Sequence, residues 1–347
     1  MKRFFFIFSI LLFTFFIQGC KSNRSEVAVR FSDEVTCEQI DAVFIGVPLN
    51  MSINKDDLFI GDSHEPMIIH YNLREKKTDR FLSKGRGPGE TLSPVALYAN
   101  PFGDKKLYRY SKQAFDMGFY PLDSLPVFVP LFKLPFGYSD VIPYEKDRFL
   151  SAGLFRDEYR YRVLNAEGTV VDRFGDYPDF LEGENLIPLD ARAMFHQVRF
   201  ANSYPKKKLV AASSYVVDII DYSLDITNES IKRILVTSYD YDYGSGLHIW
   251  TQEKRGIAKG VSSVACDDKY IYLLFDPSMV REEDKGVKKE IWIFDWDGQL
   301  IEKLKLDIDV KKITADPYSD EHTVFGIAYE ITDDDEHYKI VKVKVNL

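Results

Sequence analysis

The amino-acid sequence predicts an all-β protein, a six-bladed β-propeller with four-stranded antiparallel blades, and three observations support this fold class. Aromatic and β-branched runs bounded by turn residues follow one another along most of the chain. The same group of runs recurs about every forty to sixty residues, a period typical of propeller blades. No segment of the sequence combines a sustained helical period with helix caps, so a βαβ sheet does not fit.

The clearest unit lies in the last third of the chain. Its apolar runs include YIYLLF and IWIF, and the dipeptide Asp297-Gly298 that follows them is a strong hairpin signal. The first strand of a blade is expected to be innermost and the last outermost. The four strands of this unit are expected at residues 261–265, 270–275, 291–294 and 300–306.

Five further units show the same pattern in weaker form. A stretch without the repeat, 176–193, contains two prolines and is expected to form a surface excursion. The sixth unit has three strands, which leaves its outer edge open to pairing. Residues 27–31 (VAVRF) have strand character, and we expect them to pair beside 338–345 and close the ring. The five weaker units are expected at residues 57–82, 94–134, 139–174, 195–237 and 311–345.

The N-terminus has the features of a targeting segment. Lys2 and Arg3 precede an apolar stretch at 4–17 that is shorter than the ~20 residues a spanning helix needs. The sequence Ile-Gln-Gly-Cys that ends at Cys20 resembles the lipobox of bacterial lipoproteins, in which the cysteine takes the lipid. An ordinary secretory peptide with an incidental Cys20 is the alternative. The expected domains are a signal peptide at 1–19, a lipidated tether with the closing strand at 20–36, and the propeller at 37–347.

Composition limits the partners and the chemistry. The chain of 347 residues has a net charge of −9, which argues against a nucleic-acid partner because phosphate binding needs a basic surface. Apart from Cys20, only Cys37 and Cys266 are present, too few for a disulfide framework. The sequence leaves open whether these two are bridged or serve as small buried hydrophobic residues.

The order of strand, glycine-rich loop, proline and strand resembles the six-bladed TolB-like and NHL-like propellers. Residues 81–90, followed by Pro94, resemble the lipoprotein branch of this family in Bacteroidetes-type bacteria. The likeness covers 37–347 as architecture, whereas the distinctive motif covers about ten residues. It implies a propeller held at the cell envelope and carries over no binding positions. The Gly-x-Gly-Pro-Gly-Glu loop of that branch is matched by Gly85, Gly87, Pro88, Gly89 and Glu90.

The loop at 84–90 is the first candidate site. Its glycines permit positive φ, so successive N–H groups could face one concavity and bind an anion, with Lys84 and Arg86 adding charge. Glu90, the last residue of the loop, is counted with them as a candidate ligand-binding residue. The alternative is structural, because any propeller needs a flexible crossing from the outer edge of one blade to the axis of the next.

A second candidate site is the tyrosine-rich segment near residue 240. Alternation along an extended chain places Tyr239, Tyr241 and Tyr243 on one face, with His248 and Trp250 shortly after them. Aromatic faces beside carboxylates are suited to binding sugar rings. The alternative is a solvated loop whose tyrosines cover an outer strand.

Two functions follow from these observations. The first is an envelope-anchored lipoprotein, most consistent with the outer membrane, that binds or scaffolds a protein or glycan partner. The alternative is a hydrolase or lyase with a metal-assisted site in the axial funnel, which three or more converging His, Asp or Glu side chains would support. The six histidines form no short metal-ligand spacing, but a propeller can gather ligands from several blades at its axis, so their scatter does not decide between the two functions. We expect no cofactor, no metal and no catalytic residue.

Overall fold

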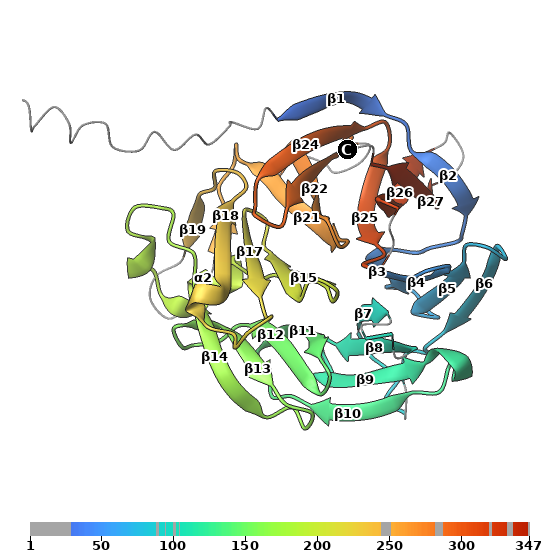
Figure 1. Ribbon diagram of the computed structural model, residues 1–347, viewed down its shortest axis with the longest axis horizontal. Helices are drawn as coiled ribbons and strands as arrows, with labels where there is room; N and C mark the ends of the chain where they lie inside the picture. Colours follow the sequence, from blue (N-terminus) through green and yellow to red (C-terminus); the bar gives the residue numbers. More distant parts are fainter. Residues whose placement is uncertain are drawn as a thin grey trace, which may run out of the picture.

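Six β-sheets surround one central axis in the computed structural model, and the first strand of each sheet lies nearest the axis (Figure 1). The structure describes residues 29–87, 90–93, 95–99, 102–103, 105–243, 251–281, 287–318, 321–331 and 336–345. The order of strands within each sheet confirms the predicted six-bladed propeller with antiparallel blades.

Each blade follows the chain from the axis outwards. The first three blades consist of β3 (Pro48–Asn54), β4 (Asp57–Asp62), β5 (Ile68–Asn72) and β6 (Lys77–Phe81); β7 (Val95–Ala99), β8 (Lys106–Ser111), β9 (Asp116–Pro121) and β10 (Val129–Lys133); and β11 (Tyr138–Glu145), β12 (Arg148–Gly153), β13 (Tyr159–Leu164) and β14 (Val170–Asp176). The last three consist of β15 (Arg199–Ser203), β16 (Lys208–Ala212), β17 (Val216–Asp221) and β18 (Ile231–Leu235); β21 (Ala258–Cys266), β22 (Tyr270–Met279), β23 (Glu290–Asp295) and β24 (Leu300–Leu306); and β25 (Asp309–Ala315), β26 (Thr323–Ile331) and β27 (Glu336–Lys344).

The place of a strand within its blade decides its composition. Second strands pack against neighbouring blades on both faces, and β4, β8, β12 and β16 are buried at nearly every residue. The outermost strands β6 and β18 contain no fully buried residue. Burial of a Val, Leu, Ile or Phe side chain contributes ~1.5–3 kcal/mol, so the inner strands hold the blades together while outer strands can remain polar.

The fifth blade contains the unit that is clearest in the sequence. Gly298 occupies the predicted hairpin turn between β23 and β24 with φ +69°, and its N–H donates to the carbonyl of Asp295 at 3.0 Å. A Cβ at this position would lie 2.7 Å from Cδ1 of Ile234 in the preceding blade. Both the backbone conformation and the close approach therefore require glycine here.

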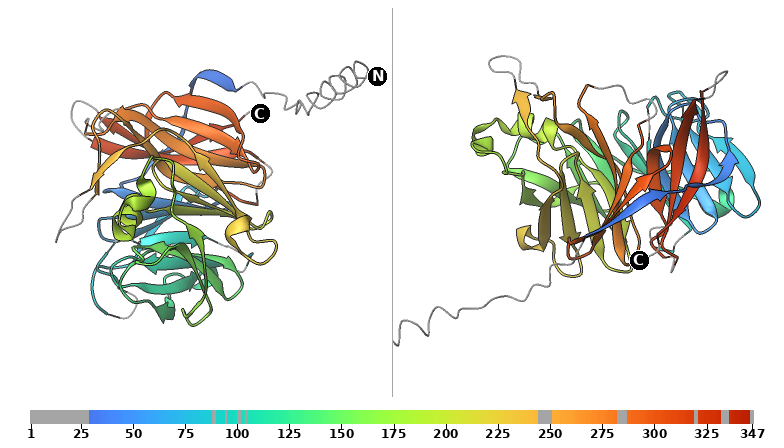
Figure 2. Two further views of the ribbon diagram at one scale, coloured as in Figure 1. Left: turned by 90° about the vertical axis from the view of Figure 1, so that its left-hand side faces the viewer. Right: turned by 90° about the horizontal axis from the view of Figure 1, so that it is seen from above.

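The N-terminal region closes the ring, but with a different segment from the one expected. The strand that completes the sixth blade is β2 (Glu38–Ala42), antiparallel to β27. The prediction that 27–31 pairs there is wrong, because β1 (Arg30–Val35) runs parallel to β24 on the outer edge of the fifth blade (Figure 2). In this pairing Phe31 opposes Lys303. Residues 27 and 28 lie outside the described residues. Consecutive strands thus bind the outer edges of two adjacent blades.

The excursion after the third blade contains the one α-helix in the described part of the chain, α2 (Leu189–Phe195). The helix spans about two turns, too short to show a helical period in the sequence. The strand expected from residue 195 consequently begins only at Arg199. A small sheet of β19 (Tyr241–Tyr243) and β20 (Thr251–Glu253) lies apart from the six blades.

Residues 1–28, with the predicted signal peptide and Cys20, lie outside the described residues. Among the described helices, none is long and apolar enough to cross a membrane. Cys37 and Cys266 are both unbridged, and Cys266 is buried. Burial, together with a hydrogen bond to Asp307, raises the pKa of the Cys37 thiol to about 12, so it is not a reactive thiolate near neutral pH.

Candidate functional site

Backbone N–H groups of the glycine-rich loop donate hydrogen bonds to acceptors within the loop or directly after it. The N–H of Gly87 donates to Oε2 of Glu90 at 2.6 Å, and the N–H of Gly85 donates to the carbonyl of Thr91 at 3.0 Å. The Glu90 carboxylate lies where a Cβ on Gly85 would fall, since the two positions are 1.9 Å apart. This geometry favours the structural role of the loop. Arg86 and Glu90 line a surface cavity of about 590 Å³ beside the second blade, so ligand binding by Lys84, Arg86 and Glu90 stays a prediction.

The tyrosine segment supplies a buried cluster. Tyr239 and Tyr241 share one face, as the alternation predicts, and their rings are nearly parallel with centroids 6.4 Å apart. Phe195 of α2 covers this face, with its ring centroid 4.1 Å from that of Tyr241. Both tyrosines are buried, whereas Tyr243 is exposed. Tyr239 and Tyr241 therefore attach the excursion to the propeller, while His248 and Trp250 lie outside the described residues.

Glu184 stands at the centre of this buried cluster. Its carboxylate accepts hydrogen bonds from Tyr239 Oη at 2.7 Å and His196 Nε2 at 2.8 Å, and from the N–H groups of Phe180 and Leu181 at 2.9 and 3.1 Å. Burial alone would raise its pKa, but the hydrogen bonds from His196 and Tyr239 outweigh burial and lower the pKa to about 2.

His196 in the same cluster is neutral at physiological pH. Burial, which the hydrogen bond to Glu184 opposes, lowers the pKa of His196 to about 4. Its Nδ1 is buried without a hydrogen-bond partner among the described residues. A second proton would therefore place an unsatisfied N–H in the core. Glu184 and His196 are engaged with each other and with their neighbours, which identifies the cluster as structural.

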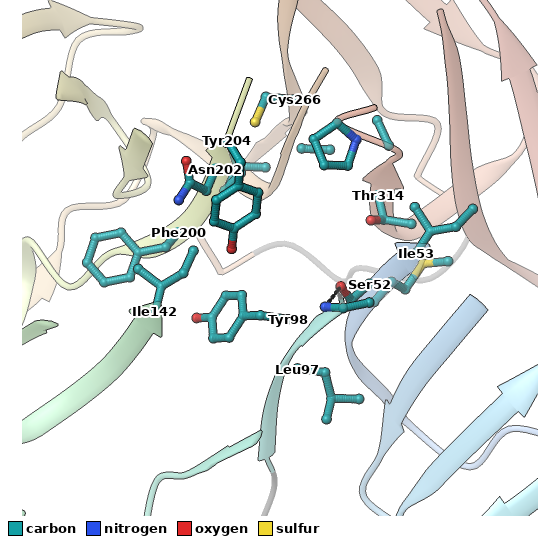
Figure 3. A pocket seen from close by; sticks show the side chains of 17 residues that line it. Ser52, Ile53, Leu97, Tyr98, Ile142, Phe200, Asn202, Tyr204, Cys266 and Thr314 are labelled. Atoms are coloured by element: carbon teal, nitrogen blue, oxygen red, sulfur yellow. Dashed lines mark hydrogen bonds between the residues drawn. The ribbon is translucent and has the colours of Figure 1, made fainter. Parts of the chain in front are cut away.

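The axial channel is the place where all six blades meet. At one end it holds a small cavity of about 70 Å³ with a mixed polar and apolar lining, into which Tyr98 and Tyr204 are directed (Figure 3). The Tyr204 ring contacts Phe102 and Tyr318, with centroids 5.2 and 6.4 Å away. Aromatic side chains thus fill this end of the channel. The adjoining cavity shares Met51, Leu97, Tyr98, Phe200 and Val264 with it, so the two lie end to end along the axis.

The adjoining cavity is a funnel of about 300 Å³ at the end where the innermost strands begin. Its charged lining consists of Lys112 from the second blade, Asp140 from β11, Arg199 from β15 and Lys312 from β25. We call this set the funnel charges. The side chains of Lys112, Arg199 and Lys312 form neither an ion pair nor a hydrogen bond with any other described residue.

Asp140 does not neutralise the three cations. Its Oδ1 accepts hydrogen bonds from Tyr98 Oη at 2.8 Å and from the N–H of Val141 at 3.0 Å. Three basic side chains and one engaged carboxylate leave the funnel net positive, even with Lys312 partly neutral near pH 7, in a protein whose overall charge is −9.

The lining of the funnel lowers the pKa of two of its cations, Lys312 and Arg199. Desolvation, followed by the positive charges of Arg199, Lys289 and Lys112, lowers the pKa of Lys312 to about 7. Desolvation also lowers the pKa of Arg199, which Asp140 opposes. Both shifts have the same physical cause: protein atoms surround the cations inside the funnel, and little negative charge lies near them. The funnel is open, since Arg199 is exposed and Lys312 is partly exposed to solvent. Uncompensated cations in a cavity are suited to binding an anion.

One group of possible metal ligands occurs among the described residues, away from the funnel. Asp267, Asp268 and His322 lie close together in turns of the fifth and sixth blades. Asp267 already accepts hydrogen bonds from Tyr272 Oη at 2.5 Å and His322 Nδ1 at 2.8 Å, as well as from two backbone N–H groups. This carboxylate ties adjacent blades together, and its lone pairs are in use.

The funnel charges could not be predicted from the sequence, because they come from four different blades and have no local spacing. Two of the funnel charges nevertheless leave a signal in the amino-acid sequence. Arg199 and Lys312 are charged residues on innermost strands, where neighbouring residues such as Phe200 and Ile313 are apolar and buried. A charge at such a position is costly unless it faces a cavity.

Comparison with known proteins places the chain in a family. The family described as TolB-like 6-blade propeller-like matches residues 29–317. No curated protein matches the chain. Among solved structures, a protein of Bacteroides fragilis described as exported is 10% identical, with a TM-score of 0.55 over 90% of this chain and 95% of that one.

Two further structures show the same fold in proteins of different activities. Regucalcin of Agrobacterium tumefaciens, described as calcium-binding, is 10% identical with a TM-score of 0.52, over 91% of this chain and 98% of that one. A streptogramin B lyase is 12% identical with a TM-score of 0.50, over 89% and 87%. At these identities the likeness concerns the fold alone. The chain belongs to the TolB-like six-bladed propeller family.

Proposed function

We propose that this protein is a lipid-anchored envelope protein that binds a small anionic ligand in its axial funnel. The observation that carries the proposal is the convergence of Lys112, Arg199 and Lys312 on one cavity without a counter-ion among the described residues. Three like charges repel one another, and Arg199 and Lys312 have each lost part of their hydration. An anion in the funnel would relieve both penalties at once.

The rest of the lining gives the funnel some selectivity. Asn50 Oδ1 is buried and has no hydrogen-bond partner within the described part of the chain, so it is available to a donor on a ligand. Phe200, Val264 and Ile313 provide apolar walls. A cavity of about 300 Å³ is at the lower end of the range for small-molecule sites, which favours a ligand of a few carbon atoms.

A protein or glycan partner, as the sequence predicts, remains compatible with this site. Such a partner would place an anionic group, for example the carboxylate of an acidic sugar, in the mouth of the funnel. The recognition chemistry is the same for a free anion and for an anionic group on a larger molecule, and a comparison of free glucuronate with an oligosaccharide that ends in glucuronate distinguishes the two.

The enzymatic alternative receives less support from the funnel. Among the described residues that line it, Asp140 is the only carboxylate and there is no histidine. A metal-assisted hydrolase or lyase gathers at least three such ligands at one point. The donor set of the funnel therefore suits an anion better than a divalent cation.

The envelope location rests on the N-terminal sequence. The basic residues, apolar stretch and Cys20 fit a lipoprotein signal, and one structural neighbour is described as exported. Two or three acyl chains on Cys20 would hold the propeller at a membrane through the residues that follow.

Isothermal titration calorimetry of the purified mature protein tests the binding site with oxalate, succinate and inorganic phosphate as probes. A hydrogen bond to a charged group contributes ~1.5–3 kcal/mol, so Arg199→Met should weaken binding roughly 10- to 100-fold. Lys206→Met is the matched control, because Lys206 is an exposed cation outside the funnel lining. Absence of binding by all three probes, or equal binding by both variants, would overturn the proposal.

A further inference from the structure

Lys312 and its neighbour Lys311 have opposite surroundings. Lys311 pairs with Asp309 Oδ2 at 2.7 Å and lies over the Tyr329 ring. Lys312, the next residue of β25, faces the funnel and has no partner within the described part of the chain. The two consecutive lysines therefore differ in the one property that matters for reactivity, which is whether the amine is held by a counter-ion.

Positive groups outnumber negative groups around Lys312. Lys112 comes from the second blade, Arg199 from the fourth and Lys289 from the fifth, and all three act on it electrostatically. Lys289 is itself held by Asp309 at 3.3 Å and by the carbonyl of Val310 at 3.1 Å. Asp140, the carboxylate in the funnel, is engaged by Tyr98.

These surroundings make a large fraction of Lys312 neutral near pH 7. Burial and the neighbouring cations lower its pKa to about 7, whereas an ordinary lysine has a pKa of about 10.4. The neutral fraction at pH 7 is therefore roughly 1,000-fold higher than in an ordinary lysine. A partly buried neutral amine beside other cations is an arrangement that activates lysine as a nucleophile.

We propose that Lys312 forms a reversible imine with the carbonyl group of a 2-oxo carboxylate whose carboxylate group is held by Arg199. The inference rests on the proposed function, since the funnel must first bind the anion. The amine nitrogen attacks the carbonyl carbon, and a proton moves from nitrogen to oxygen to give a carbinolamine. Loss of one water then leaves the carbon–nitrogen double bond. The imine nitrogen then takes up one proton from solvent, and the resulting positive charge lies beside the ligand carboxylate, which stabilises it.

Borohydride trapping tests this inference directly. Mature protein is incubated at pH 7 with pyruvate and sodium cyanoborohydride, which reduces the imine to a stable secondary amine, and the adduct is located by peptide mass spectrometry. We expect one adduct per chain at Lys312. Lys312→Arg, which keeps the charge, should reduce total labelling at least 10-fold, whereas the neighbouring Lys311→Arg should leave labelling unchanged.

Two further arms separate the inference from the proposed function. Acetaldehyde has the carbonyl but not the carboxylate, so Arg199→Met should reduce labelling by pyruvate and leave labelling by acetaldehyde unchanged. Oxalate has the carboxylates but no ketone, and Lys312→Arg should still bind it. Oxalate binding without a pyruvate adduct at Lys312, or labelling of the wild type spread evenly over surface lysines, would refute the imine and leave the anion site standing. Failure to bind either anion would refute the proposed function itself.

Discussion

Replacement of Asp218 by asparagine should destabilise the propeller more than any other single change of charge at the junction of the third and fourth blades. Asp218 is fully buried in β17. Its carboxylate accepts hydrogen bonds from Arg160 Nη1 at 2.6 Å, Tyr161 Oη at 2.7 Å, and Arg233 Nε and Nη2 at 2.7 and 3.0 Å. The carboxylate therefore joins β17 and β18 of the fourth blade to β13 of the third.

The expected loss of stability comes from the two arginines that the substitution leaves without a negatively charged partner. Asp218→Asn would place a neutral amide against two guanidinium groups, of which that of Arg160 is almost completely buried. Removal of one partner from a buried ion pair costs about 3–5 kcal/mol. For a domain of this size that corresponds to a decrease in Tm of roughly 6–15 °C. The control is Asp221→Asn on the same strand, whose partly exposed pair with Lys208 should be worth less than about 1 kcal/mol.

Thermal and urea unfolding of both variants measure this difference, and pH supplies a second test. Burial alone would raise the pKa of Asp218, but Arg160 and Arg233 together lower it below the ordinary value. Its contribution is therefore present above the unfolded pKa of about 3.9 and is lost as the pH falls below it. The gap between wild type and Asp218→Asn should narrow below about pH 4. A decrease in Tm under about 2 °C at pH 7 would refute the reasoning.

Three further predictions concern the core, the ring closure and the anchor. The pKa of His196 is lowered to about 4, so its contribution to stability is full above about pH 6.5 and is lost as the pH falls towards 4. The variant His196→Gln should therefore show a smaller change of the unfolding free energy with pH over this range. An unchanged pH profile would contradict a neutral buried histidine. Deletion of residues 21–42 removes both β1 and β2 and should lower the Tm far more than deletion of 21–36. The reason is that β2 completes the sixth blade and that its Asp41 accepts a hydrogen bond from Tyr71 at 2.8 Å. Equal effects of the two deletions on the Tm would show that β2 is dispensable. Cys20→Ala should abolish incorporation of labelled palmitate and release the protein from membranes, and unchanged membrane association would count against the anchor.

Much of the fold could be predicted because propeller blades repeat their strands. Buried runs such as those in β8, β12 and β22 leave a clear apolar signal. The outer strands do not, because one of their faces meets solvent. The polar sequence of β2 therefore gives no sign of a closing strand, whereas residues 27–31, with their alternating apolar character, do.

The candidate site was less predictable than the fold. Tyr239 and Tyr241 do share a face, but the sequence could not show that Phe195 covers it, because that contact depends on a two-turn helix about forty-five residues away. The funnel charges are brought together only by closure of the ring. Their chemistry is visible in the sequence as single charged residues on inner strands, whereas their convergence is a property of the whole fold.

Proton uptake on ligand binding is the most direct test of whether the funnel cations hold an anion. A bound anion favours the protonated form of Lys312, so binding near pH 7 should draw protons from the buffer. Calorimetric titration with oxalate in two buffers of different ionisation enthalpy reports this uptake. We predict an uptake of about half a proton for each oxalate at pH 7, since a group with a pKa of about 7 is half protonated before binding. We also predict weaker binding as the pH rises to 9 and no uptake in Lys312→Arg. Binding with no proton uptake and no change between pH 7 and 9 would contradict the claim.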